Sequence, residues 1–277
     1  MKKGRARAGK IAGFMAVLGG AALLLAPAAA QAQTGPIYFT PKIMYSHQMS
    51  DGFDATGKFS GFELNSGKYS GSDKTDNTFG GGLAIGYDFG EVGDFPVRTE
   101  LEYLIRSRSE AKYPTKRTSS SASGISFIDS DYRTEATVQT VFANVYFDFR
   151  NDSAFTPYIG AGLGGANVKG ELKSKHTGQM YNTNNGRGYT LDNDFDGSHE
   201  SWNFAWNLSA GASYRFTDSV ALDLSYRYSD FGEVEYGTHG FQLYDMADGS
   251  HIGGYGGKAK SDLTAHEVIL GVRISAF

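Results

Sequence analysis

Apolar and polar residues alternate in two successive runs between Trp206 and Tyr228. Every second residue from Trp206 to Phe216 is apolar, and so is every second residue from Val220 to Tyr228. Alternation of this length is typical of β-strands, and the polar residues 217–219 between the runs predict a tight hairpin. Each run has about 10 residues, which is the length that a tilted transmembrane strand needs.

The same pattern predicts six further strands, at residues 37–47, 79–89, 97–105, 141–149, 157–165 and 263–277. Short connections at 90–95, 150–155 and 217–219 alternate with four long polar segments at 50–77, 112–136, 169–200 and 230–260. We expect the long segments to be surface loops. The sequence therefore predicts an all-β fold, an eight-stranded antiparallel up-and-down transmembrane β-barrel with both chain ends on the short-turn side.

Alternation alone does not say which strand face lies inside the barrel. A soluble, lipocalin-like barrel would turn its apolar residues inward. Here aromatic residues gather at both ends of the apolar faces, as in the two interfacial girdles of a membrane barrel, and the opposite faces carry charges at mid-strand. We therefore expect the apolar faces to contact lipid.

The opposite faces then define a charged lumen. An eight-stranded barrel is just wide enough for side chains to fill, and buried charges need partners, so we expect a network of ion pairs inside. Five cations and five carboxylates are assigned to this network: Lys42, Arg98, Arg106, Arg215 and Arg227 with Asp88, Glu100, Glu102, Asp148 and Asp223.

The last strand is harder to orient. Leu270, Val272 and Ile274 are in phase with one another, but the terminal Phe277 is one residue out of phase. Either the strand carries a bulge or its last residues leave the ladder, and the facing of Glu267 and Arg273 stays open.

Residues 1–32 are predicted to be a cleaved signal peptide, so that residues 33–277 form the barrel domain. This segment has a basic start, an apolar stretch rich in alanine and leucine, and a small-residue cleavage site. The chain has no cysteine, which excludes a disulfide framework, and a net charge of -4, which gives no reason to expect nucleic-acid binding.

Three motifs carry a resemblance to a known family: Thr156-Pro-Tyr-Ile-Gly-Ala-Gly-Leu-Gly164, Ser213-Tyr-Arg-Phe-Thr-Asp218 and Ala221-Leu-Asp-Leu-Ser-Tyr-Arg-Tyr228. They resemble the opacity-protein-like outer-membrane barrels, which share their architecture with outer membrane protein A. The closing Leu270, Val272, Ile274 and Phe277 are similar to the signal that the barrel-assembly machinery reads. The resemblance implies a Gram-negative outer membrane, with its lipid and lipopolysaccharide, as the location.

Candidate chemistry is sparse. Residues 192–197 match the first half of a calcium-binding loop, but Asn203 stands where the bidentate glutamate belongs, which favours a solvated acidic segment. The six histidines show no zinc-binding spacing, and no nucleophile motif is present. We therefore predict no catalytic residue, no metal site and no cofactor.

The long polar segments are rich in tyrosine, serine, glycine and asparagine, the composition of adaptable binding loops. The sequence favours a surface protein with a structural, antigenic or adhesin-like role, carried by extracellular segments that bind a host or matrix ligand. A small porin-like channel is the alternative, and a lipid-modifying enzyme is a third hypothesis.

Overall fold

The computed structural model describes residues 35–60, 67–93, 95–121 and 124–276. The elements are β1 (Ile37–Ser60), β2 (Gly67–Ser70), β3 (Lys74–Asp88), α2 (Gly90–Gly93), β4 (Val97–Arg106), β5 (Ser109–Ser121), β6 (Gly124–Asp148), β7 (Phe155–Asn182), β8 (Arg187–Arg215), β9 (Val220–Asp245) and β10 (His251–Ala276). The described residues include no helix long and apolar enough to cross a membrane. The expected signal peptide and Phe277 lie outside the described residues.

Eight strands close into an antiparallel ring in the order β1, β3, β4, β6, β7, β8, β9 and β10, because β10 also pairs with β1. The predicted fold class is thereby confirmed. Outside the ring, β5 continues the line of β4 along β6, and the short β2 is added to β1.

The closing ladder between β1 and β10 keeps one register from Ile37 and Ala276 to Asp51 and Asp262. The bulge or early departure expected near the end of the last strand is therefore absent from the described residues. Within this stretch only Thr40 and Pro41 have no partner on β10. The other pairs satisfy the backbone groups of the first and last strands together.

The prediction of four long loops is wrong. Most of those segments are β-structure, since β6 begins at Gly124, β7 runs to Asn182, β8 begins at Arg187 and β9 runs to Asp245. The connection between β7 and β8 is a turn in which Gly186 has φ +69°, a conformation that glycine adopts without strain. Ladder pairing between β8 and β9 is interrupted only between the pairs at Thr190 and Trp206.

The polarity of the wall reverses along the barrel axis. Near the short turns, Leu83, Leu163 and other large apolar side chains point outward and the charged residues point inward. Farther along the same strands the apolar side chains lie inside and the charges lie outside, as in a soluble protein. The first arrangement suits lipid and the second suits water, so only the short-turn half has the outer surface of a membrane barrel.

An apolar core fills the other half of the barrel. Phe53 is fully buried, stacks on Tyr113 with ring centroids 4.2 Å apart, and lies near Tyr132 and Tyr236. Burial raises the pKa of Tyr113 to about 12. These aromatic contacts hold this half of the barrel together, where no lipid supports it.

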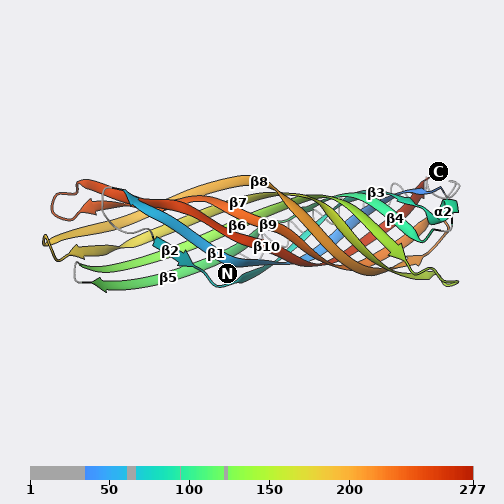
Figure 1. Cartoon of the computed structure of the whole chain (residues 1–277), viewed down its shortest axis with the longest axis horizontal. Helices are drawn as coiled ribbons and strands as arrows, with labels where there is room; N and C mark the ends of the chain where they lie inside the picture. Colours follow the sequence, from blue (N-terminus) through green and yellow to red (C-terminus); the bar gives the residue numbers. More distant parts are fainter. Residues whose placement is uncertain (1–34, 61–66, 94, 122–123, 277) are drawn as a thin grey trace, which may run out of the picture.

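The long strands make one elongated body, as Figure 1 shows. β8 has 29 residues, which corresponds to roughly 95 Å along the strand at about 3.3 Å per residue. Because a membrane crossing needs only about 10 of them, more than half of this strand projects beyond the lipid-facing band. We call this projecting part the tower.

We expect Phe53→Ala to loosen the tower and leave the membrane part intact. The loss of a buried aromatic ring should lower the free energy of unfolding by about 3–5 kcal/mol. Limited proteolysis should cut the tower faster, while heat-modifiable migration on a denaturing gel is retained. Leu208→Ala on the outward face is the control, and equal proteolysis of both variants would contradict this account of the core.

Candidate functional site

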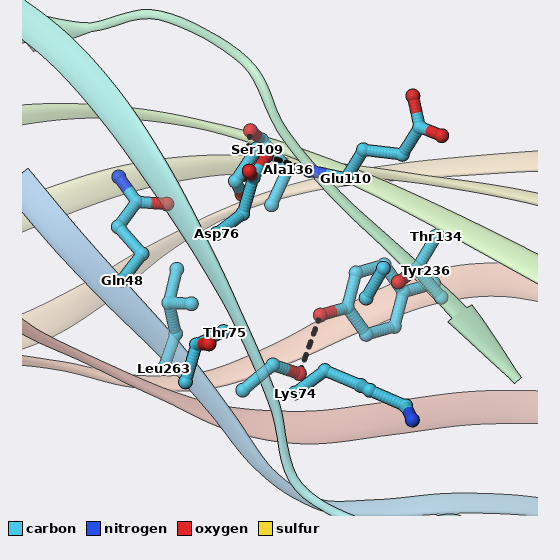
Figure 2. A pocket seen from close by; sticks show the side chains of 12 residues that line it. Gln48, Lys74, Thr75, Asp76, Ser109, Glu110, Thr134, Ala136, Tyr236 and Leu263 are labelled. Carbon is cyan, nitrogen blue, oxygen red and sulfur yellow. Dashed lines mark hydrogen bonds between the residues drawn. The ribbon is translucent and has the colours of Figure 1, made fainter.

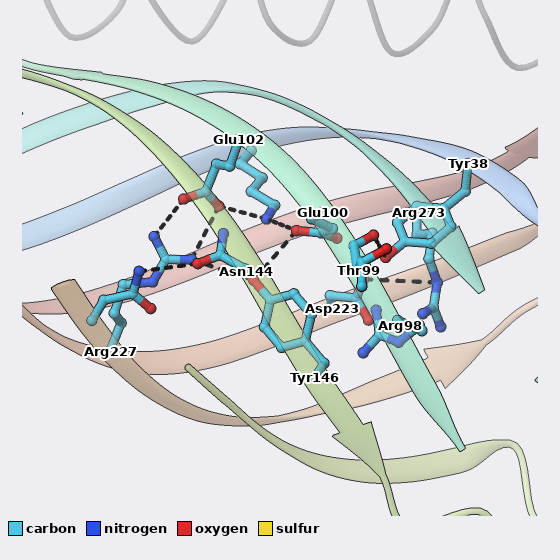
Figure 3. Close-up of polar contacts among 12 residues, drawn as sticks. Tyr38, Arg98, Thr99, Glu100, Glu102, Asn144, Tyr146, Asp223, Arg227 and Arg273 are labelled. Carbon is cyan, nitrogen blue, oxygen red and sulfur yellow. Dashed lines mark hydrogen bonds and ion pairs between the residues drawn. The ribbon is translucent and has the colours of Figure 1, made fainter. Parts of the chain in front are cut away.

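Eight of the ten charges predicted to face the lumen are buried within it: Lys42, Arg98, Glu100, Glu102, Arg106, Asp148, Asp223 and Arg227. At the centre, the ammonium of Lys42 lies 2.5 Å from Glu100 and 2.6 Å from Glu102. Arg227 donates to both oxygens of Glu102, at 2.6 and 3.0 Å. Figure 3 shows Glu102 and Glu100 between Arg227 and Arg98 along the lumen.

A second layer lies nearer the short turns. Arg98 donates two hydrogen bonds to Asp148, at 2.7 and 2.9 Å, and its guanidinium lies 5.0–5.1 Å from the ring centres of Tyr146 and Tyr158. Gly211 makes room for Tyr158, because a Cβ there would lie 2.8 Å from the ring. Glycines on the inward face therefore allow large side chains to fill the lumen.

Two charges left unassigned from the sequence also face inward. Glu267 is fully buried, accepts a hydrogen bond of 2.7 Å from Arg106, and accepts another from Ser229. Arg273 donates to Ser213 and lies over the ring of Tyr38. The alternation of Glu267 with Val268 and Leu270 indicates from the sequence that Glu267 faces inward. The one-residue offset of Phe277 obscured this indication.

Asp88 and Arg215 lie at the short-turn rim rather than among the lumen pairs. Asp88 accepts a hydrogen bond of 2.6 Å from Arg150, and Arg215 is exposed. Both line a cavity of about 190 Å³ that reaches Asp148 and Arg273. The alternating pattern gives the face of a residue but not its depth, so rim and lumen charges look alike in the sequence.

The lumen between these layers is tightly filled. The cavity beside Lys42, Glu100 and Tyr146 has a volume of about 10 Å³, which is at the lower limit for one water molecule. Toward the tower, the guanidinium of Arg106 lies 4.6 Å from the ring centre of Phe231, where the apolar core begins. The arrangement acts as a plug of paired charges covered by apolar side chains.

A small polar cavity lies between β3 and β5, just above the lipid-facing band. It has a volume of about 20 Å³ and is lined by Gln48, Ser50, Asp76 and Tyr236. Figure 2 labels Gln48, Asp76 and Tyr236 among the residues around it. The buried amide of Gln48 has no hydrogen-bond partner among the described residues. The volume and lining suit a single water molecule rather than a sugar or a cofactor.

The far end of the tower carries apolar side chains on its outer face. Ile125, Phe127, Tyr181 and Met246 are each 41–51% exposed. Ile125 and Tyr181 are cross-strand neighbours, and a Cβ on Gly188 would touch both Tyr181 and Met246. We call these four residues the distal patch. Exposed apolar clusters far from lipid mark interaction surfaces.

The acidic segment 192–197 is part of β8. Within the described ranges, no group of three or more His, Asp or Glu side chains is arranged to hold a metal ion. Of the expected assembly signal, Leu270, Val272 and Ile274 lie in β10 at the short-turn end, and Phe277 is beyond the described residues.

We expect Glu102→Gln to destabilise the barrel. The change leaves Lys42 and Arg227 facing a neutral amide in the lumen, and the loss of one partner from a buried ion-pair group costs about 3–5 kcal/mol. Urea unfolding in lipid vesicles should show a lower midpoint. Glu91→Gln in the exposed helix α2 should not move it; equal midpoints for both variants would refute the expectation.

We expect the refolded barrel of residues 33–277 to be electrically silent in a planar bilayer, because paired charges and the apolar core occupy the lumen. A Glu100→Ala/Arg106→Ala variant, which removes one carboxylate and one cation, should show brief small openings. Stable openings of the unaltered protein would show that the plug moves, and would favour the porin-like alternative.

Comparison with known proteins gives one consistent result. A family model for an outer membrane protein β-barrel domain matches residues 18–273. Outer membrane protein PagN of Salmonella typhimurium is 35% identical over 210 residues, which cover 75% of this chain and 79% of PagN. A candidate adhesin of Rickettsia conorii is 29% identical over 148 residues, which cover 53% of this chain and 54% of the adhesin. An opacity protein of Neisseria gonorrhoeae is 24% identical over 168 residues, which cover 55% of this chain and 69% of the opacity protein.

Proposed function

Because the chain belongs to the outer membrane protein β-barrel domain family, we propose that its tower presents an adhesive surface to the outside of a Gram-negative cell. The protein is located in the outer membrane, and the resemblance to the opacity proteins is confirmed. The tower is then extracellular and the short turns are periplasmic.

The distal patch is the observation that carries this proposal. Most outward positions of the tower are polar, as water requires, but Ile125, Phe127, Tyr181 and Met246 break the rule at its membrane-distal end. The membrane in which the barrel is inserted cannot cover this patch, so its partner comes from outside the cell. Aromatic residues at the centre of a polar rim are typical of binding hot spots.

The partner class we infer is a host-cell or matrix ligand. The relative in Rickettsia conorii supports this role through its designation as a candidate adhesin. We propose no enzymatic activity and no cofactor.

Export and insertion belong to the same proposal. We infer that residues 1–32 are cleaved on export and that the barrel-assembly machinery reads Leu270, Val272, Ile274 and Phe277. We also infer contact between the tower wall and lipopolysaccharide, which forms the outer leaflet.

The test is attachment of bacteria that display the protein to cultured epithelial cells and to immobilised matrix proteins. Phe127→Ser/Tyr181→Ser should reduce attachment by roughly tenfold or more, because the loss of central aromatic contacts typically costs at least about 2 kcal/mol. Thr177→Ala on the neighbouring part of β7 is the matched control. Undiminished attachment of the double variant, with heat-modifiable migration retained, would refute the proposal.

A further inference from the structure

Two histidines lie side by side on the outer face of the barrel. His47 on β1 and His266 on β10 are direct cross-strand neighbours in the ladder that closes the ring. Both side chains are half-buried and face outward, since the adjacent Ser46 and Glu267 are fully buried inside. The Cβ atoms of directly opposed residues are about 4.5–5.5 Å apart, so one ion can reach both imidazole rings.

One nitrogen of each ring is held by a flanking strand. The Nδ1 of His47 lies 2.7 Å from the amide oxygen of Asn77 on β3. The Nδ1 of His266 lies 2.5 Å from the hydroxyl of Tyr226 on β9. The strands follow one another in the order β3, β1, β10 and β9, so these two contacts lie on opposite sides of the pair. Because the two nitrogens of an imidazole point to opposite sides of the ring, each Nε2 is directed toward the other histidine.

The same contacts select the form of the ring that binds a metal ion. An amide oxygen only accepts, so the Nδ1 of neutral His47 carries the hydrogen and its Nε2 carries the lone pair. The hydroxyl of Tyr226 can accept the same bond from His266. Among the described residues, neither Nε2 has a hydrogen-bond partner. In protein metal sites a histidine ligand almost always donates its second N–H to an oxygen in this way.

The outward face just above the pair carries negative charge. On the four strands and the residues that lead into them, the charged side chains that face outward within four residues of the row are Asp51, Asp73, Asp230 and Asp262. Lys74 turns inward instead, 5.8 Å from the ring centre of Tyr113. Burial and the neighbouring carboxylates of Asp73 and Asp262 raise the pKa of Asp51. The field above the pair therefore favours a cation.

The pair lies at the outer boundary of the lipid-facing band. Tyr45 is two residues closer to the membrane centre than His47, and its ring lies 5.4 Å from that of Phe79. The ring of Tyr228 lies 5.3 Å from that of His266. Such rings are typical of the aromatic belt between lipid and water. An ion in the extracellular water can thus reach both histidines without entering lipid.

We propose that His47 and His266 bind one divalent transition-metal ion through their Nε2 atoms, while Asn77 and Tyr226 hold the two rings in place. Neutral imidazole suits copper, zinc and nickel, and Cu²⁺ is held most tightly by a given set of nitrogen ligands. Two protein ligands leave the remaining positions to water, unlike a closed structural zinc site. The two histidines come from opposite ends of the chain, so no sequence spacing reveals them.

The experiment titrates untagged, refolded residues 33–277 in detergent micelles with copper(II) chloride. Quenching of tryptophan fluorescence reports binding, because the ring of Trp206 lies 5.6 Å from that of Tyr228, which contacts His266. His47→Gln and His266→Gln should each weaken binding about tenfold or more, since even a supporting group of a metal site counts for that much. His251→Gln, an exposed histidine at the far end of β10, is the matched control. Unchanged affinity in either of the first two variants would refute the proposal.

Two further readouts separate ligation from a change of fold. Electron paramagnetic resonance of the Cu²⁺ complex should show two nitrogen ligands in the unaltered protein and one in each single variant. The same number of nitrogen ligands in all three would overturn the assignment. Tyr226→Phe keeps the ring but removes the oxygen, so it should weaken binding about tenfold while heat-modifiable migration is retained. Unchanged binding would overturn the role given to Tyr226.

Competition identifies the class of ion and of ligand. Zn²⁺ should displace Cu²⁺ at high concentration, whereas Mg²⁺ should not, because it prefers oxygen ligands. Binding should also be lost between about pH 7 and about pH 5, since protonated imidazole, with a pKa of about 6.5 in free histidine, cannot ligate. Displacement by Mg²⁺ as effective as that by Zn²⁺ would assign the ion to Asp51 and Asp262 and overturn the proposal.

The metal site is independent of adhesion at the distal patch. His47→Gln/His266→Gln should retain attachment to epithelial cells, and Phe127→Ser/Tyr181→Ser should retain Cu²⁺ binding. Loss of Cu²⁺ binding in the patch variant, with its migration on the gel unchanged, would contradict the position assigned to the metal.

Discussion

The closed ring of backbone hydrogen bonds is the constraint on which the rest of this structure depends. In lipid no water satisfies an unpaired backbone group, so β1 must pair with β10 to close the ring. Once the ring closes with eight strands, its interior is narrow and its inward side chains are fixed by the alternation. The buried charges then have to be paired with one another, as Lys42, Glu102 and Arg227 are.

Outside the membrane the same ring meets a different solvent. The strands continue, but each face exchanges its chemistry, so Phe53 and Leu172 lie inside while Lys112 and Lys173 lie outside. The ring is also less complete there, since ladder pairing between β8 and β9 is interrupted and, among the described residues, β5 pairs only with β6. Water can satisfy open edges in the tower, whereas lipid cannot.

The sequence was sufficient to predict the strands of the membrane half, because their outward faces are apolar. The strands expected at 79–89, 97–105 and 141–149 lie within or closely match β3, β4 and β6. The tower was missed because its alternation is inverted: polar residues dominate the composition, while the inward positions of Tyr113, Tyr132 and Leu172 keep period two. The depth of Asp88 and Arg215 could not be predicted, since alternation carries no information on position along the barrel axis.

The tower has a mechanical consequence, because its strands are those of the barrel itself. β7 runs from Phe155 to Asn182 without a break in its pairing with β6 or β8. A pull on the distal end is directed along the strands, so it loads many ladder hydrogen bonds in shear at once instead of opening them one by one. The described part of β7 has no hinge to dissipate such a load, and an attached cell would be held by the lipid-embedded ring itself.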